Sequence, residues 1–124
     1  MSTLDELNSK YALCDGAICS INLQYADFVN EVYIDPAVEL IVEVRKEVAK
    51  KLVPVRLVLE FQQLLEVSIF DNTLRDNIFS DFKFFETTEG YYLSFDPYDN
   101  TQCIHDNDNG IIRAKFFQYR ELEI

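Results

Sequence analysis

Residues 35–52, DPAVELIVEVRKEVAKKL, decide which class of fold this chain adopts. Asp35 followed by Pro36 favours a helix start, because Asp caps a first turn and proline needs no N–H partner there. Five residues would then share one helical face: Ala37, Ile41, Val44, Val48 and Leu52. Four apolar residues, however, also recur at a period of two: Val38, Leu40, Val42 and Val44. Because β-branched residues favour extended backbone, we predict a strand from 37 to about 46, with a helix over 36–52 as the open alternative.

The same period of two recurs along most of the chain. It predicts further strands over residues 17–25, 31–35, 53–61, 65–70, 82–88, 91–96, 101–106 and 111–123. A break at Gln62-Gln63 separates the strand at 53–61 from the one at 65–70. The strands at 82–88 and 91–96 are expected to form a hairpin, because Gly90 supplies the positive φ that a tight turn needs.

Few residues follow a helical pattern. In residues 2–13, acidic side chains suit the first turn of a helix, and three apolar residues fall at helical spacing: Leu4, Leu7 and Tyr11. Residues 71–79 are expected to form a single helical turn or an irregular loop. Units of strand, long helix and strand are absent from the pattern, which argues against a doubly wound parallel sheet. We therefore predict an α+β, β-dominated fold, namely an antiparallel curved sheet or small sandwich with a short N-terminal helix.

Length and composition indicate a single domain over residues 1–124. A chain of this size buries roughly 65% of its unfolded surface, and 48% hydrophobic with 27% charged residues is an ordinary globular composition. The start, MSTLDELNSKY, lacks a signal-peptide pattern, and no apolar run reaches the roughly 20 residues of a membrane helix. The three cysteines, Cys14, Cys19 and Cys103, form no CxxC pair, so we expect reduced thiols in a cytoplasmic protein.

Charge is the most informative global property. The net charge is −11, and between Glu66 and Asp108 ten acidic residues are opposed only by Arg75 and Lys83, a balance of −8. A solvated surface that maintains solubility is one explanation, and a negative face that attracts a basic partner is the other. We expect no nucleic-acid binding, because phosphate neutralisation needs a basic stripe. We also expect no membrane partner, because no apolar run is long enough for a membrane helix.

The stretch CIHDNDNG, residues 103–110, holds the only histidine of the chain and resembles a metal site. In a calcium-loop frame with Gly110 as the central glycine, His105 would be the first ligand and Phe116 would replace the bidentate glutamate. Cys103 and His105 alone do not complete a zinc site. We therefore expect no metal and no other cofactor, and we predict a tight turn that presents Asp106 and Asp108 to solvent.

After this turn, the terminal strand is expected to be half-buried, with two faces of different character. One parity is mostly apolar: Ile112, Ala114, Phe116, Leu122 and Ile124. The other is mostly polar: Arg113, Lys115, Tyr119 and Glu121. Together with 101–106, this strand would form a hairpin around Asn107 to Gly110.

A catalytic function is not supported by any motif in the chain. A cysteine–histidine pair would require Cys14 or Cys19 to approach His105, and no orienting motif accompanies either cysteine. Carboxylate pairs such as Asp96 and Asp99 are frequent in so acidic a chain and do not identify an acid and a base. We therefore expect that the protein is not an enzyme.

Three stretches together resemble small β-rich immunity proteins of bacterial polymorphic toxins, of the contact-dependent growth inhibition type. They are LCDGAICSINL (13–23), VPVRLVLEFQQLLEVSIF (53–70) and CIHDNDNGIIRAKFFQYRELEI (103–124). The resemblance lies in the alternation within the strands and in the acidic turn of the terminal hairpin. It implies a cytoplasmic protein that blocks a cognate toxin domain, often a basic nuclease, by covering its active site or an exosite.

If the resemblance holds, the contact surface should combine acidic residues with aromatic anchors. The residues expected to bind the partner are Asp96, Tyr98, Asp99, Asp106 and Asp108, with Tyr91 or Tyr92 nearby. Two other classes of function remain open. One is a small-ligand-binding or catalytic domain with an aromatic-lined cavity, and the other is a subunit that binds its complex through an exposed sheet edge.

Overall fold

The computed structural model describes residues 3–69, 78–79 and 82–122. Within these residues the chain forms one helix and nine strands. In chain order they are α1 (Thr3–Lys10), β1 (Tyr11–Gln24), β2 (Asp27–Val29), β3 (Val32–Ile34), β4 (Ala37–Val48), β5 (Lys51–Ser68), β6 (Ile78–Phe79), β7 (Lys83–Thr87), β8 (Gly90–Asp96) and β9 (Asn109–Glu121). Of the segment 71–79, predicted as a helical turn or loop, residues 71–77 lie outside the described residues, and residues 78–79 form β6 instead.

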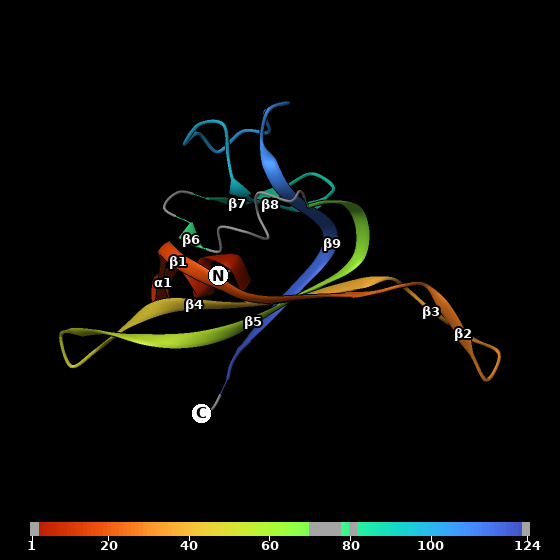
Figure 1. Cartoon of the computed structure of the whole chain (residues 1–124), viewed down its shortest axis with the longest axis horizontal. Coiled ribbons are helices and arrows are strands. Elements are labelled where there is room, and N and C mark those ends of the chain that lie inside the picture. The colour runs from red at the N-terminus through yellow and green to blue at the C-terminus, as the bar shows by residue number, and fades with distance from the viewer. Residues whose placement is uncertain (1–2, 70–77, 80–81, 123–124) are drawn as a thin grey trace.

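Seven of the strands form one antiparallel sheet in the order β6-β1-β4-β5-β9-β8-β7, and β2 and β3 form a separate pair. The large sheet curls strongly: β5 and β9 run through its lower part and then bend upward to the level of β7 and β8 (Figure 1). The predicted β-dominated α+β class with a short N-terminal helix is confirmed, and the form adopted is the curved sheet.

The decisive stretch 35–52 is a strand. β4 pairs with β1 on one side and with β5 on the other, so its backbone groups have partners in both directions. Its four alternating residues are all buried: Val38, Leu40, Val42 and Val44. The predicted strand is therefore confirmed, and Asp35-Pro36 precedes β4 instead of starting a helix.

The curl is built into β5 and β9. Residues 53–61 and 65–70 were predicted as separate strands, which is wrong, because β5 continues through Gln62-Gln63. Gln63 has a φ of +53°, and the register with β9 shifts between Leu64 and Glu66. A single left-handed residue redirects the strand while the ladder on either side continues.

The bend also changes which residues face the core. On β9, Ile112 and Ala114 are buried as predicted, but the next buried residue is Phe117. Phe116 was predicted to share their face and is instead exposed. A strict period of two is lost where the strand coils, so the predicted parity is wrong at Phe116 and Phe117, and Ile124 lies outside the described residues.

The core lies inside the curl. Leu4 and Leu7 of α1 are buried against it, and the rings of Phe61, Phe84 and Phe117 form its centre. The centroids of Phe84 and Phe117 are 4.8 Å apart at an interplanar angle of 80°, a favourable edge-to-face pair. This cluster connects β5, β7 and β9, which are far apart in sequence.

Other predicted boundaries need correction. The helix ends at Lys10 rather than 13, because Tyr11 begins β1 and is buried in the core. The strand predicted over 101–106 does not form, and β8 rather than that segment is the hairpin partner of β9. β2 was not predicted. The β7–β8 hairpin is confirmed, with Gly90 at a φ of +148°.

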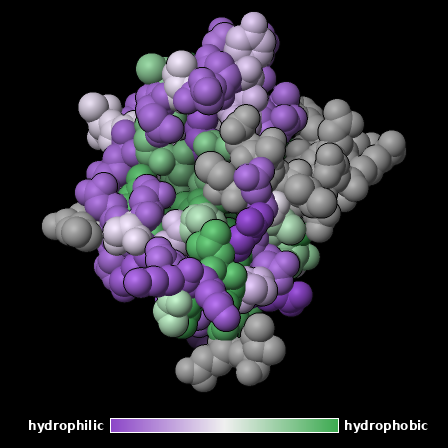
Figure 2. All heavy atoms as spheres, turned by 90° about the vertical axis from the view of Figure 1, so that its left-hand side faces the viewer, coloured by the Kyte–Doolittle hydropathy of each residue, from purple (hydrophilic) through white to green (hydrophobic). Residues whose placement is uncertain are grey.

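One side of the molecule presents both polar and apolar residues (Figure 2). Viewed from the side of the β4–β5 turn, most of it is hydrophilic, around a central band of hydrophobic residues (Figure 2). In the described part of the chain, no helix is long and apolar enough to cross a bilayer.

Candidate recognition loop

Residues 97–108 connect β8 to β9 and include most of CIHDNDNG. We refer to them as the recognition loop. The ladder between the two strands ends at the pair Asp96 and Asn109, and the loop lies beyond it in the upper part of the molecule (Figure 1). It contains no regular secondary structure, so its shape depends on side chains.

The first of these side chains is Lys83 of β7, which is fully buried. Its Nζ lies 2.7 Å from the carbonyl oxygen of Cys103, 3.0 and 3.1 Å from the two carboxylate oxygens of Asp108, and 2.7 Å from Oδ1 of Asp99. An ammonium group has three N–H donors, and these three residues accept from all of them. Burial lowers the pKa of Lys83, but the hydrogen bonds to Asp99 and Asp108 outweigh it and raise the pKa above its ordinary value.

The second is Asp108, whose carboxylate is also buried. Besides Lys83, it accepts hydrogen bonds from the Tyr92 hydroxyl at 2.6 Å, the Tyr98 N–H at 2.9 Å and the His105 N–H at 3.0 Å. Burial alone would raise the pKa of Asp108, but these donors favour the charged form and lower the pKa to about 2. Asp108 is therefore ionised at neutral pH.

The buried Lys83–Asp108 pair fixes the recognition loop at several points. Asp108 accepts hydrogen bonds from the backbone N–H groups of Tyr98 and His105, and Lys83 donates to the Cys103 carbonyl oxygen. Because Lys83 also binds Asp108, both halves of the loop are connected to β7. In the described residues, every buried side-chain nitrogen and oxygen has a hydrogen-bond partner. A satisfied network of this kind holds one conformation, because each alternative would leave a buried polar group unpaired.

His105 takes part through its backbone and its ring. Its Nδ1 accepts a hydrogen bond from the Asn107 N–H at 3.0 Å, which places the proton of the neutral ring on Nε2. The ring stacks on Tyr98, with centroids 4.0 Å apart and an interplanar angle of 12°. The His105 ring thus packs against one face of the exposed Tyr98 ring, while its Nδ1 holds the backbone at Asn107.

The seven residues predicted to contact a partner fall into three groups, which are exposed, half-buried and buried. Asp96, Tyr98 and Asp106 are exposed, with 62% of Tyr98 accessible, and Asp99 is half-buried because it binds Lys83. Tyr91 is half-buried and packs with Phe84 and Phe117.

Tyr92 and Asp108 are buried, so the prediction that Asp108 is presented to solvent is wrong. The physical reason is Lys83: its burial requires a buried carboxylate beside it.

Lys83 itself was missed as a residue of this site. A signal existed, because Lys83 is the only Lys or Arg between Arg75 and Arg113, within the most acidic part of the chain. It also lies among apolar neighbours in the stretch DFKFFE. A single cation in such surroundings indicates a buried ion pair.

The Lys83 ammonium occupies the position that a cation would need in this cluster of oxygens. Asp99, Asp108 and the Cys103 carbonyl all point to Nζ. In the described part of the chain, no group of three His, Cys, Asp or Glu residues is arranged to hold a metal ion. The two cysteines whose side chains are described, Cys19 and Cys103, are exposed free thiols.

A pocket of about 490 Å³ lies elsewhere, where β1 ends and β4 begins. Of its eight lining residues only Phe116 is aromatic, and three are glutamines. It therefore differs from the aromatic-lined cavity that the small-ligand alternative requires.

Comparison of the chain with protein-family models, curated proteins and solved structures found no match.

Proposed function

We propose that this protein is a non-catalytic immunity or antitoxin protein that neutralises a cognate toxin domain by binding it through an acidic surface. The observation that carries the proposal is the recognition loop, which the buried Lys83–Asp108 pair holds in one conformation. A loop that is ordered before binding loses little conformational entropy when the partner arrives.

The exposed residues of the loop and of the adjoining end of β8 suit a basic protein. Asp96 at the end of β8 and Asp106 in the loop are exposed carboxylates, and Tyr98 is an exposed aromatic residue with a polar tip, of the kind enriched in binding hot spots. The stretch from Glu66 to Asp108 carries a balance of −8 in a chain of net charge −11. Such a field accelerates encounter with a cationic partner and repels anionic ones. A toxin that acts on nucleic acid, and is basic for that reason, fits this description.

The experiment is a rescue and binding assay with the product of the neighbouring reading frame. If that product is toxic when expressed alone, co-expression of this chain should restore growth, and the two proteins should form a complex measurable by titration calorimetry. The variant D96N/D106N and the variant Tyr98→Ala should each weaken the complex by about tenfold or more, which corresponds to about 1.4 kcal/mol.

The matched control is E43Q/E47Q, which removes two exposed carboxylates from β4 and leaves the loop intact. It lowers the negative charge of the chain as much as D96N/D106N does. A non-toxic neighbour that forms no complex would contradict the proposal. Equal effects of the loop and control variants would contradict the assignment of the surface.

A further inference from the structure

The hairpin formed by β2 and β3 projects from the body of the protein. The two strands pair only with each other in the described sheets, through three residue pairs, and no third strand extends them. Figure 1 shows the hairpin at the right-hand end of the molecule, beyond the strands of the main sheet. We refer to residues 25–35 as the arm.

The arm is apolar on both faces. Phe28 and Tyr33 are direct cross-strand partners with ring centroids 5.3 Å apart, and they are 70% and 52% exposed. Val29 and Val32 are the next pair, and because successive residues alternate they lie on the opposite face. Both valines are exposed, as is Tyr25 at the base of the arm.

A free arm of this composition is unfavourable in water. A two-stranded hairpin is marginally stable alone, and a cluster of exposed apolar side chains indicates an interaction surface. The backbone nevertheless forms the hairpin, since Asn30 and Glu31 have φ values of +51° and +67°, as the tight turns that match strand twist require. The arm is thus shaped for contact on both faces.

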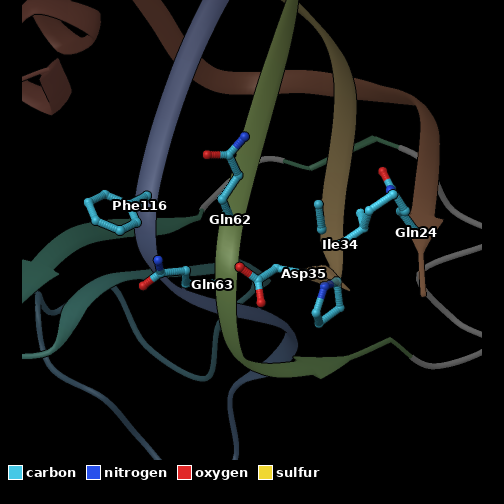
Figure 3. A pocket seen from close by; sticks show the side chains of 8 residues that line it. Gln24, Ile34, Asp35, Gln62, Gln63 and Phe116 are labelled. Atoms are coloured by element: carbon cyan, nitrogen blue, oxygen red, sulfur yellow. The ribbon is translucent and has the colours of Figure 1, made fainter. Parts of the chain in front are cut away.

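The pocket of about 490 Å³ lies at the base of the arm. Ile34 and Asp35 line it from the arm, Gln24 from the end of β1, and Gln63 and Phe116 from the bend of β5 and β9. In Figure 3 the Asp35 carboxylate lies toward Gln63 and Phe116, with Gln24 and Ile34 on its other side. A carboxylate, amide oxygens and an exposed aromatic ring are the groups that bind a guanidinium or ammonium ion.

Charge identifies the kind of protein that would cover this surface. From residue 11 to residue 44 the chain has six acidic residues and no Lys or Arg. Three of the six belong to the arm: Asp27, Glu31 and Asp35. A second copy of this chain would bring equal negative charges together, whereas a basic partner would neutralise them.

We propose that the arm and the pocket at its base form an interaction surface for a basic protein. Apolar groups of the partner cover Phe28, Tyr33 and the two valines, and an Arg or Lys side chain of the partner enters the pocket beside Asp35. This surface is separate from the recognition loop, which joins β8 and β9 at the top of Figure 1. The inference does not depend on the partner being a toxin.

The test is a selection of binding peptides from a random library displayed on phage, with this chain immobilised. Peptides enriched on the wild type should combine Arg or Lys with apolar residues. A synthetic copy of the most enriched peptide should bind the variant F28S/Y33S at least about tenfold more weakly. It should bind Asp35→Asn several-fold more weakly.

The matched control is V48S/L52S at the β4–β5 hairpin. Val48 and Leu52 are 48% and 58% exposed, but this hairpin is rich in lysine rather than acidic. The control should bind the peptide like the wild type. Asp35→Asn leaves the apolar residues of the arm in place, so it tests the pocket even if F28S/Y33S alters the hairpin, which circular dichroism would show.

Three outcomes would overturn the inference. In these, peptides are enriched on the wild type no more than on F28S/Y33S, the enriched peptides lack Arg and Lys, or the synthetic peptide binds F28S/Y33S as tightly as the wild type. Sedimentation velocity supplies a fourth criterion. We expect a monomer, and a dimer that F28S/Y33S dissociates would make a second copy the occupant instead. No toxin enters this experiment, so its result is independent of the function proposed above.

Discussion

Lys83 and Asp108 are the two side chains on which the recognition loop depends most. Replacing Lys83 with Met keeps much of the buried aliphatic stem but leaves the Asp108 carboxylate buried without its cation. Removing one partner of a buried ion pair costs about 3–5 kcal/mol. We expect K83M to lower the free energy of unfolding in urea by about 3 kcal/mol.

The double variant K83M/D108N should recover part of that loss, because the unpaired charge is then gone. Lys115→Met, at an exposed position of β9, is the control and should change stability by less than about 0.5 kcal/mol. A K83M variant as stable as this control would show that the pair does not hold the fold together.

Asp108 also predicts a dependence of stability on pH. Its pKa is about 2 in the folded protein, below the ordinary value of 3.8. A carboxylate with a lowered folded-state pKa stabilises the protein above its unfolded pKa and loses that contribution as the pH falls through its folded pKa. We therefore expect the advantage of the wild type over Asp108→Asn to be constant above about pH 5 and to shrink by about 2 kcal/mol between pH 4 and pH 2.

The measurement is urea unfolding of both proteins across this pH range. Asp99 and Glu121 also have lowered pKa values, but both are present in the variant, so the difference between the two curves reports Asp108. A difference that stays constant down to pH 2 would mean that Asp108 has an ordinary pKa.

The burial of Asp108 could not be predicted from the sequence. Its partner Lys83 is 25 residues away along the chain, and the local pattern of Asn, Asp and Gly is the same for an exposed turn as for a loop that surrounds an ion pair. The exposure of Asp96, Tyr98 and Asp106 could be predicted, because polar residues in loops and at strand ends are usually solvated. Local sequence thus identified exposed residues between the two strands, but not the loop itself, because residues 101–106 were predicted as a strand.

Among the strands, the ones that could be predicted are those with regular alternation. β4 was recognised because apolar residues at every second position outweigh one favourable helix start, and pairing on both sides then buries them. β5 was divided in two because Gln62-Gln63 interrupts the alternation, although the strand only bends there. β2, the other strand of the short hairpin, was not predicted.

The turn between β4 and β5 contains a strain that can be relieved. Ala49 and Lys50 connect the strands with φ values of +53° and +65°. Residues other than glycine and asparagine are disfavoured there by roughly 1 kcal/mol each. Asn-Gly is the preferred pair for a two-residue turn of this kind. We expect A49N/K50G to raise the free energy of unfolding by about 1 kcal/mol.

Lys51→Gly, one residue further along, is the control for that prediction. Lys51 lies in β5, where glycine weakens a strand, so this change should destabilise the protein. If both variants lower stability in urea unfolding, the turn does not have the geometry described.

The overall shape follows from features that a strand pattern does not encode. The same set of strands is compatible with a sandwich or with one curved sheet, so the sequence left both forms open. The left-handed Gln63 and the shift of register beside it bend β5 and β9. The bend brings Phe84 of β7 against Phe61 and Phe117, and α1 closes the core with Leu4 and Leu7. Within the described residues, the seven-stranded sheet and α1 together surround the core.

The charge of the whole molecule opposes this compact fold and should make its stability depend on salt. With a net charge of −11, most charges on the surface repel one another. Raising the ionic strength from about 0.01 to 0.15 M shortens the Debye length from about 30 to 8 Å, which screens exposed charges much more than the buried Lys83–Asp108 pair. We expect NaCl over this range at pH 7 to raise the melting temperature by about 4 °C, or about 1 kcal/mol for a domain of this size.

The same salt should act in the opposite direction on binding, because it screens the attraction between the acidic surface and a basic partner. D96N/D106N removes two of the excess negative charges, so its melting temperature should rise less with NaCl, and its association rate should be less sensitive to salt.

A melting temperature that falls as NaCl is added would mean that exposed ion pairs, such as those of Arg113 with Glu66 and Glu89, stabilise the protein more than the net charge destabilises it. The acidic surface would then contribute to the stability of the fold itself, and its charge would no longer be evidence of a basic partner.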